Sequence, residues 1–112
     1  MKDRKLLGKL GENLAAGILY AEGFDVLERN FTSYYGEADL ICEKGDVIWF
    51  VEVKTRMSGK FGAPAEAVDG VKQRRIRKTA EYYMMKHGRG KYAAFKVMEI
   101  LVRETDDDFG IG

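Results

Sequence analysis

The sequence has little cysteine, proline, histidine or net charge, and it has no long hydrophobic run. Its single cysteine, Cys42, cannot form a disulfide within the chain, so nothing requires an oxidising compartment. The longest apolar run, residues 47–51, is far too short to cross a bilayer, and no signal-peptide hydrophobic region follows the N-terminal charges. These absences predict a cytoplasmic protein with no membrane segment. Taken alone, a net charge of +1 also argues against a nucleic-acid partner.

The sequence does contain enough apolar material for one folded domain. Hydrophobic residues make up 46% of the 112 residues and aromatic residues 12%, which is too much for a disordered chain. A chain of this length buries somewhat over about 60% of its surface on folding, which gives a modest core. We therefore expect a single domain over residues 1–103 and a flexible acidic tail over residues 104–112.

Hydrophobic periodicity predicts six main elements in the order αβββαβ. They are a helix over residues 3–22, strands over 24–31, 37–43 and 47–55, a helix over 69–87 and a strand over 92–103. Between the third strand and the second long helix we expect a loop over residues 56–62 and a short helical segment over 65–68. The expected buried faces are Leu7, Leu10, Leu14, Ile18 and Ala21 on the first helix and Val71, Ile76, Ala80, Tyr83 and Met84 on the second. Glycines inside the first helix also suggest that it packs closely on a sheet.

Two carboxylates and a lysine form the main candidate site. Glu52 and Lys54 lie two residues apart on the strongest strand and therefore project from one face of it. A hairpin turn at residues 44–46 would place Asp39 opposite residue 51 or 52, close to Glu52. Paired carboxylates are costly without a compensating cation, and Mg²⁺ prefers such oxygen ligands. The pattern indicates metal-dependent phosphodiester hydrolysis, although a solvated ion pair between Glu52 and Lys54 would give the same spacing.

The near-zero total charge conceals an uneven distribution along the chain. Residues 1–53 carry a net charge of −4, residues 54–96 carry +9 and residues 97–112 carry −4. The basic segment includes the candidate nucleic-acid-binding residues Arg56, Lys60, Lys72, Arg74 and Arg75. Such a run is often only a solvated helix face, but beside an acidic metal site it is what docking of a phosphodiester backbone requires. The distribution therefore favours a polyanionic partner.

Several motifs, in this order, resemble the bacterial YraN-like family. They are residues 11–15 (GENLA), 36–41 (GEADLI), 51–56 (VEVKTR), 61–62 (FG) and 65–68 (AEAV), and the resemblance covers about residues 8–100. That family is similar to Holliday-junction resolvases and other PD-(D/E)XK nucleases. The resemblance implies a restriction-endonuclease-like αβββαβ core, a mixed central sheet flanked by helices.

Carried over by position, the resemblance also assigns roles to individual residues. It makes Asp39 and Glu52 ligands of Mg²⁺ or Mn²⁺, Lys54 the catalytic lysine and Glu12 the residue that completes the acidic cluster. Gln73 matches a supporting polar position. One departure is Lys96, where relatives commonly carry Asp after the Phe of the last strand. That position is not one of the core metal ligands.

The sequence thus supports a ranked set of functions. The first is a metal-dependent endonuclease that hydrolyses DNA, on branched or damaged substrates, and the resemblance to resolvases makes a homodimer a further expectation. The second is a catalytically inactive nucleic-acid-binding module of the same fold. The third is a protein-interaction domain with no DNA role, since fold and motif do not guarantee activity.

Overall fold

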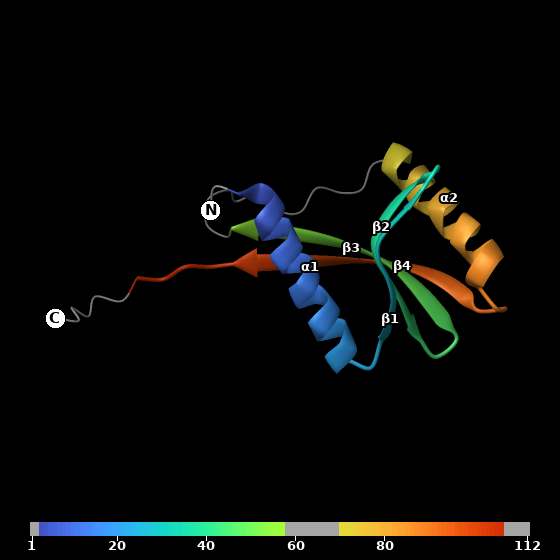
Figure 1. Ribbon diagram of the computed structural model, residues 1–112, viewed down its shortest axis with the longest axis horizontal. Helices are drawn as coiled ribbons and strands as arrows, with labels where there is room; N and C mark the ends of the chain where they lie inside the picture. The colour runs from blue at the N-terminus through green and yellow to red at the C-terminus, as the bar shows by residue number, and fades with distance from the viewer. Residues whose placement is uncertain (1–2, 58–69, 107–112) are drawn as a thin grey trace.

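The computed structural model describes residues 3–57 and 70–106, which form two helices and one four-stranded sheet (Figure 1). The elements are α1 (Arg4–Ala21), β1 (Asp25–Ser33), β2 (Gly36–Lys44), β3 (Val47–Met57), α2 (Gly70–His87) and β4 (Tyr92–Val102). The predicted αβββαβ order is therefore confirmed as a mixed α/β arrangement. Lys60, the helical segment over 65–68 and the expected start of the second helix at Asp69 lie outside the described residues. Residues 104–106 of the expected tail form no helix or strand.

The sheet has the order β1-β2-β3-β4, with β4 at one edge. The first three strands form an antiparallel meander, and β4 lies parallel to β3, as expected for a strand reached through a helical crossover. Strand β3 continues two residues beyond its predicted end, because Arg56 and Met57 still pair with Leu101 and Val102 of β4. Arg56 thus lies on a strand rather than in a loop.

Two buried clusters lie on opposite faces of the sheet. Under α1, Leu40, Cys42 and Val51 pack with Ala15 and Leu19 of the helix. Under α2, alternate residues of the same strands, including Ile41, Ile48 and Phe50, pack with Tyr83. Since side chains alternate along a strand, β2 and β3 supply both layers. Burial also raises the pKa of the Cys42 thiol to about 11, so this cysteine is inert at neutral pH.

The buried face of α1 differs from the predicted one. The helix begins after Asp3, whose carboxylate accepts a hydrogen bond from the Leu6 N–H at 3.0 Å. Its buried residues are Gly11, Ala15 and Leu19, whereas Leu10 is 49% exposed and Leu14 is 55% exposed. The predicted leucine stripe therefore lies largely on the surface.

The close approach of α1 to β3 explains which face of this helix is buried. A Cβ placed on Gly11 would overlap the hydroxyl of Thr55 and would lie 2.8 Å from the Thr55 Cβ. Only a residue without a side chain fits there, so the helix docks through its small residues rather than its leucines. The suggestion that helix glycines allow close packing holds at Gly11, whereas a Cβ at Gly8 or Gly17 would meet no described atom within 4 Å.

The second helix covers only part of the other face. Its core residues are Tyr83 and Thr79, and Thr79 donates a hydrogen bond to the Arg75 carbonyl oxygen at 2.8 Å. Val71, which was expected to be buried, is 51% exposed. The helix packs mainly on β2, and Phe95 on the same side of β4 stays 40% exposed. Among the described elements, α2 therefore leaves the β4 side of this face open.

Candidate functional site

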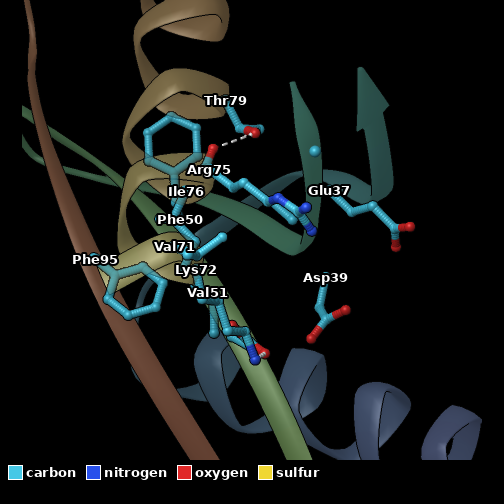
Figure 2. A pocket seen from close by; sticks show the side chains of 13 residues that line it. Glu37, Asp39, Phe50, Val51, Val71, Lys72, Arg75, Ile76, Thr79 and Phe95 are labelled. Atoms are coloured by element: carbon cyan, nitrogen blue, oxygen red, sulfur yellow. Dashed lines mark hydrogen bonds and ion pairs between the residues drawn. The ribbon is translucent and has the colours of Figure 1, made fainter. Parts of the chain in front are cut away.

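A cleft of about 480 Å³ opens between α2 and the sheet (Figure 2). Its lining residues come from β2, β3, β4 and α2, and they include Asp39, Glu52, Lys72, Arg75 and Phe95. We refer to it as the Asp39 cleft. In Figure 2, Asp39 and Phe95 lie on opposite sides of this cleft, and Lys72 lies between them.

Asp39 is held where the β2–β3 ladder stops. The final pair of that ladder is Leu40 with Val51, so one further step along β2 brings Asp39 beside Glu52. The predicted hairpin register is thereby confirmed. Beyond this pair, Asp39 Oδ2 accepts a hydrogen bond from the backbone N–H of Val53 at 2.7 Å. A side chain thus replaces a strand carbonyl as acceptor, which fixes the carboxylate in the cleft.

The surroundings of Asp39 oppose its negative charge. Burial is the main reason that the pKa of Asp39 is raised, and the charges of Glu12, Glu52 and Glu37 raise it further, while the Val53 N–H acts in the opposite direction. A cation close to such a carboxylate would stabilise its charged form. Within residues 3–57 and 70–106, no group of three or more His, Cys, Asp and Glu side chains is close enough to hold a metal ion together. Three carboxylates, those of Glu37, Asp39 and Glu52, line the cleft, and Asp39 and Glu52 are the two that lie at neighbouring positions on β2 and β3.

The remaining predicted catalytic residues lie outside the cleft lining. Glu12, on α1, contributes its charge to Asp39 and faces the amide of Asn30, which donates to Glu12 Oε2 at 3.1 Å when its nitrogen points toward the carboxylate. Lys54 follows Glu52 by two residues on β3 and is partly buried. Asn30 has a φ of 52°, an irregularity of β1 that no sequence pattern indicated.

The basic residues divide into several groups. Lys72 forms an ion pair with Glu52, and Arg75 reaches from α2 toward β2 (Figure 2). Gln73 lines a neighbouring pocket, and Arg74 is exposed. Arg56 lies 3.8 Å from Glu99 of β4 in an ion pair. The cationic wall of the Asp39 cleft is thus the N-terminal half of α2.

The end of the basic segment does not belong to this wall. Arg89 and Lys91 both form ion pairs with Glu43, at the turn end of β2, and the Lys91 distance is 3.0 Å. Lys96 lies on the α1 side of the sheet, where its ammonium stacks over Trp49 at 4.9 Å from the ring centroid. Lys96, the position at which the family resemblance led us to expect Asp, therefore lies outside the lining of the Asp39 cleft.

Comparison with known proteins assigns the family. The sequence profile of the family described as Uncharacterised protein family UPF0102 matches residues 11–100. The chain belongs to the UPF0102 family. A UPF0102 protein of Dictyoglomus thermophilum is 45% identical over 104 residues, which is 92% of this chain and 88% of the relative. A UPF0102 protein of Syntrophomonas wolfei is 48% identical over 99 residues, which is 88% of this chain and 86% of the relative. One of Clostridium tetani is 40% identical over 108 residues, which is 96% of this chain and 88% of the relative.

The YraN-like resemblance is confirmed by this UPF0102 membership. The family match runs from Gly11 within α1 to Ile100 in β4, so it includes Glu12, Asp39, Glu52 and Lys54. Sequence reasoning missed Phe95 as a cleft residue, although its place on the last strand among alternating apolar residues was a usable signal. In the part of the UPF0102 chain that the structure describes, neither helix is long and apolar enough to cross a membrane.

The unfavourable charge of Asp39 makes a prediction about stability. Asp39→Asn keeps an oxygen acceptor for the Val53 N–H and removes the charge, so we expect the variant to be more stable at pH 7 by on the order of 1 kcal/mol. Because the folded-state pKa lies above the ordinary 3.8, the cost of the charge is present at neutral pH and disappears as the pH falls toward that value. Urea unfolding of both chains without metal, from pH 7 to pH 4, measures this. A difference in the free energy of unfolding between the two proteins that increases on acidification would contradict this prediction.

Proposed function

We propose that this UPF0102 protein is a metal-dependent endonuclease that hydrolyses DNA phosphodiester bonds. The observation that carries the proposal is the pairing of Asp39 with Glu52 in one cleft whose wall is the basic helix α2. The finer fold assignment, a restriction-endonuclease-like core, is part of the same proposal. It is supported by the αβββαβ order and by a mixed sheet with the candidate carboxylates on neighbouring central strands.

The residues in the cleft fit a Mg²⁺ or Mn²⁺ ion by their chemistry. Asp39 and Glu52 offer carboxylate oxygens. Burial and, to a smaller extent, repulsion from neighbouring carboxylates raise the Asp39 pKa, and a divalent cation would favour the charged form that both effects oppose. When bound, such an ion supplies Lewis acidity toward a phosphate oxygen and a more acidic water. Two carboxylates leave most coordination positions to water and phosphate, which is the usual arrangement for Mg²⁺.

The chain's own residues would divide the remaining work. Lys72 and Arg75 present positive charge to a phosphate that enters the cleft. Lys54, two residues beyond Glu52, is the group proposed to orient the attacking water or to stabilise charge on the phosphate in the transition state. Glu12 adds negative charge beside Asp39 and so favours a cation there.

A second candidate function is supported by the ion pair between Lys72 and Glu52. An ammonium already placed against Glu52 supplies positive charge at the position where a metal would act. The same surface would then bind DNA without cutting it. This alternative predicts binding that weakens steeply with salt and does not respond to metal.

One experiment separates these functions. The purified protein is incubated with end-labelled single-stranded, duplex, flap and four-way-junction DNA in Mg²⁺, Mn²⁺, Ca²⁺ or EDTA. We expect cleavage of at least one DNA in Mg²⁺ or Mn²⁺ and none in EDTA. Salt-sensitive binding in every buffer without any cleavage would favour the inactive module, and the absence of binding at low salt would leave only a protein-interaction role.

A further inference from the structure

A second pocket adjoins the Asp39 cleft on the open side of the sheet. It measures about 460 Å³, within the range of about 300–1,000 Å³ typical of small-molecule sites. Phe50, Ile76 and Phe95 line both spaces, so the two are immediate neighbours. We call this space the α2–β4 pocket.

The lining of the pocket is mostly apolar and includes one cationic side chain. Phe50, Ala93 and Phe95 supply apolar surface from β3 and β4, and Ile76 supplies it from α2. Gln73 and Arg77, also on α2, add an amide and a guanidinium. A flat ligand with polar edges, attached to an anionic chain, matches this combination.

Of the two aromatic rings that line both spaces, Phe95 is the exposed one. Phe95 is 40% exposed and lines both the α2–β4 pocket and the Asp39 cleft, in which its ring lies beside β4 (Figure 2). The ring of Phe50 is only 2% exposed, so of these two rings it is Phe95 that offers a face to a ligand. An exposed aromatic ring beside a phosphate site is a stacking platform for a base.

We propose that the α2–β4 pocket binds an unpaired DNA base next to the phosphodiester held at the Asp39 cleft. This inference rests on the proposed function. The charge of α2 supports it, because its described residues include Lys72, Arg74, Arg75, Arg77, Lys78 and Lys86 and only one acid, Glu81. A base inside a duplex has both faces covered by its neighbours, so only an unpaired or unstacked nucleotide can reach Phe95. The substrate class is therefore DNA with single-stranded character at the cleavage site, such as a flap, a junction or a mismatch.

The test uses DNA with 2-aminopurine at successive positions, in Ca²⁺ so that binding is observed without cutting. The parent protein should change the fluorescence at one or two neighbouring positions and should bind single-stranded DNA more tightly than duplex. Phe95→Ala should abolish the fluorescence change and weaken single-strand binding by about 5- to 150-fold, since stacking contributes about 1–3 kcal/mol per base. Duplex binding should change less than twofold.

Three further variants make the result decisive. Phe95→Tyr keeps a ring and should retain the signal, whereas Phe95→Leu keeps an apolar side chain and should lose it. Tyr20→Ala removes a 74% exposed ring on α1 and should bind as the parent does. Equal losses on single-stranded and duplex DNA, or a full signal in Phe95→Leu, would overturn the base pocket while leaving the nuclease proposal intact. A parent protein that binds no DNA overturns both, and a signal without cleavage in Mg²⁺ overturns only the nuclease.

Discussion

Asp39→Asn and Glu52→Gln should each reduce metal-dependent DNA cleavage by about 1,000-fold or more, on the scale of removing a principal charge-stabilising group from an active site. Both substitutions keep the size of the side chain and remove one negative charge from the Asp39 cleft. Asp39→Asn also keeps an acceptor for the Val53 N–H, so the loss cannot be assigned to unfolding. Single-turnover cleavage in Mg²⁺, followed on the best substrate of the DNA panel, measures the effect.

The matched control is Glu81→Gln. Glu81 is an exposed acid of α2 outside the cleft lining, and its substitution should leave cleavage within about twofold of the parent. DNA binding by Asp39→Asn and Glu52→Gln should persist, because the cationic wall of Lys72 and Arg75 is retained. Parental rates in both cleft variants would remove Asp39 and Glu52 from the proposed site.

Gly11→Ala should destabilise the folded protein by about 2 kcal/mol, even though alanine is the better helix former. The new methyl group would overlap the Thr55 hydroxyl and approach the Thr55 Cβ to 2.8 Å, so α1 has to move off the sheet. Overpacking of this kind costs about 1–3 kcal/mol or more, and the gain in helix propensity of up to about 1 kcal/mol offsets only part of it. A loss of 1 kcal/mol lowers the Tm of a domain of about 100 residues by roughly 4–8 °C.

Gly17→Ala provides the opposite result on the same helix. A methyl group at this position would meet no described atom within 4 Å, so the substitution should stabilise the protein by about 0.5–1 kcal/mol. Thr55→Ala in the Gly11→Ala background should restore part of the lost stability, because it removes the hydroxyl and methyl groups that collide. Equal effects of alanine at positions 11 and 17 would show that the helix does not pack on β3 through Gly11.

Most of the fold was predictable because its elements are strongly patterned. Periods of 2 and 3.6 located all six elements of the described chain, and a short turn at residues 44–46 set the β2–β3 register. The buried face of α1 was not predictable in the same way. Leu10 and Leu14 form the more hydrophobic stripe, but the helix sits on the sheet through Gly11 and Ala15. The close fit of the helix against Thr55, a residue distant in sequence, outweighed the hydrophobicity of the leucine stripe in determining which face of α1 is buried.

Only the part of the candidate site that lies on β2 and β3 was predictable from the sequence. Asp39 and Glu52 came together because a hairpin relates them through local register. The ion pair of Lys72 with Glu52 depends on where α2 crosses the sheet, which no local pattern specifies. The exposure of Phe95 likewise follows from the displacement of α2 toward β2.

The hydrogen bond from Val53 to Asp39 couples the backbone of β3 directly to the cleft. An amide proton donated to a carboxylate resonates according to the charge on that carboxylate, so the ¹H–¹⁵N signal of Val53 should shift whenever a proton or a cation reaches Asp39. The amide of Trp49, which is paired with Cys42 in the same ladder and lies outside the cleft lining, provides an internal reference on the same strand. Occupancy of the cleft can thus be followed in solution from one backbone resonance, without a substrate and without any substitution in the chain.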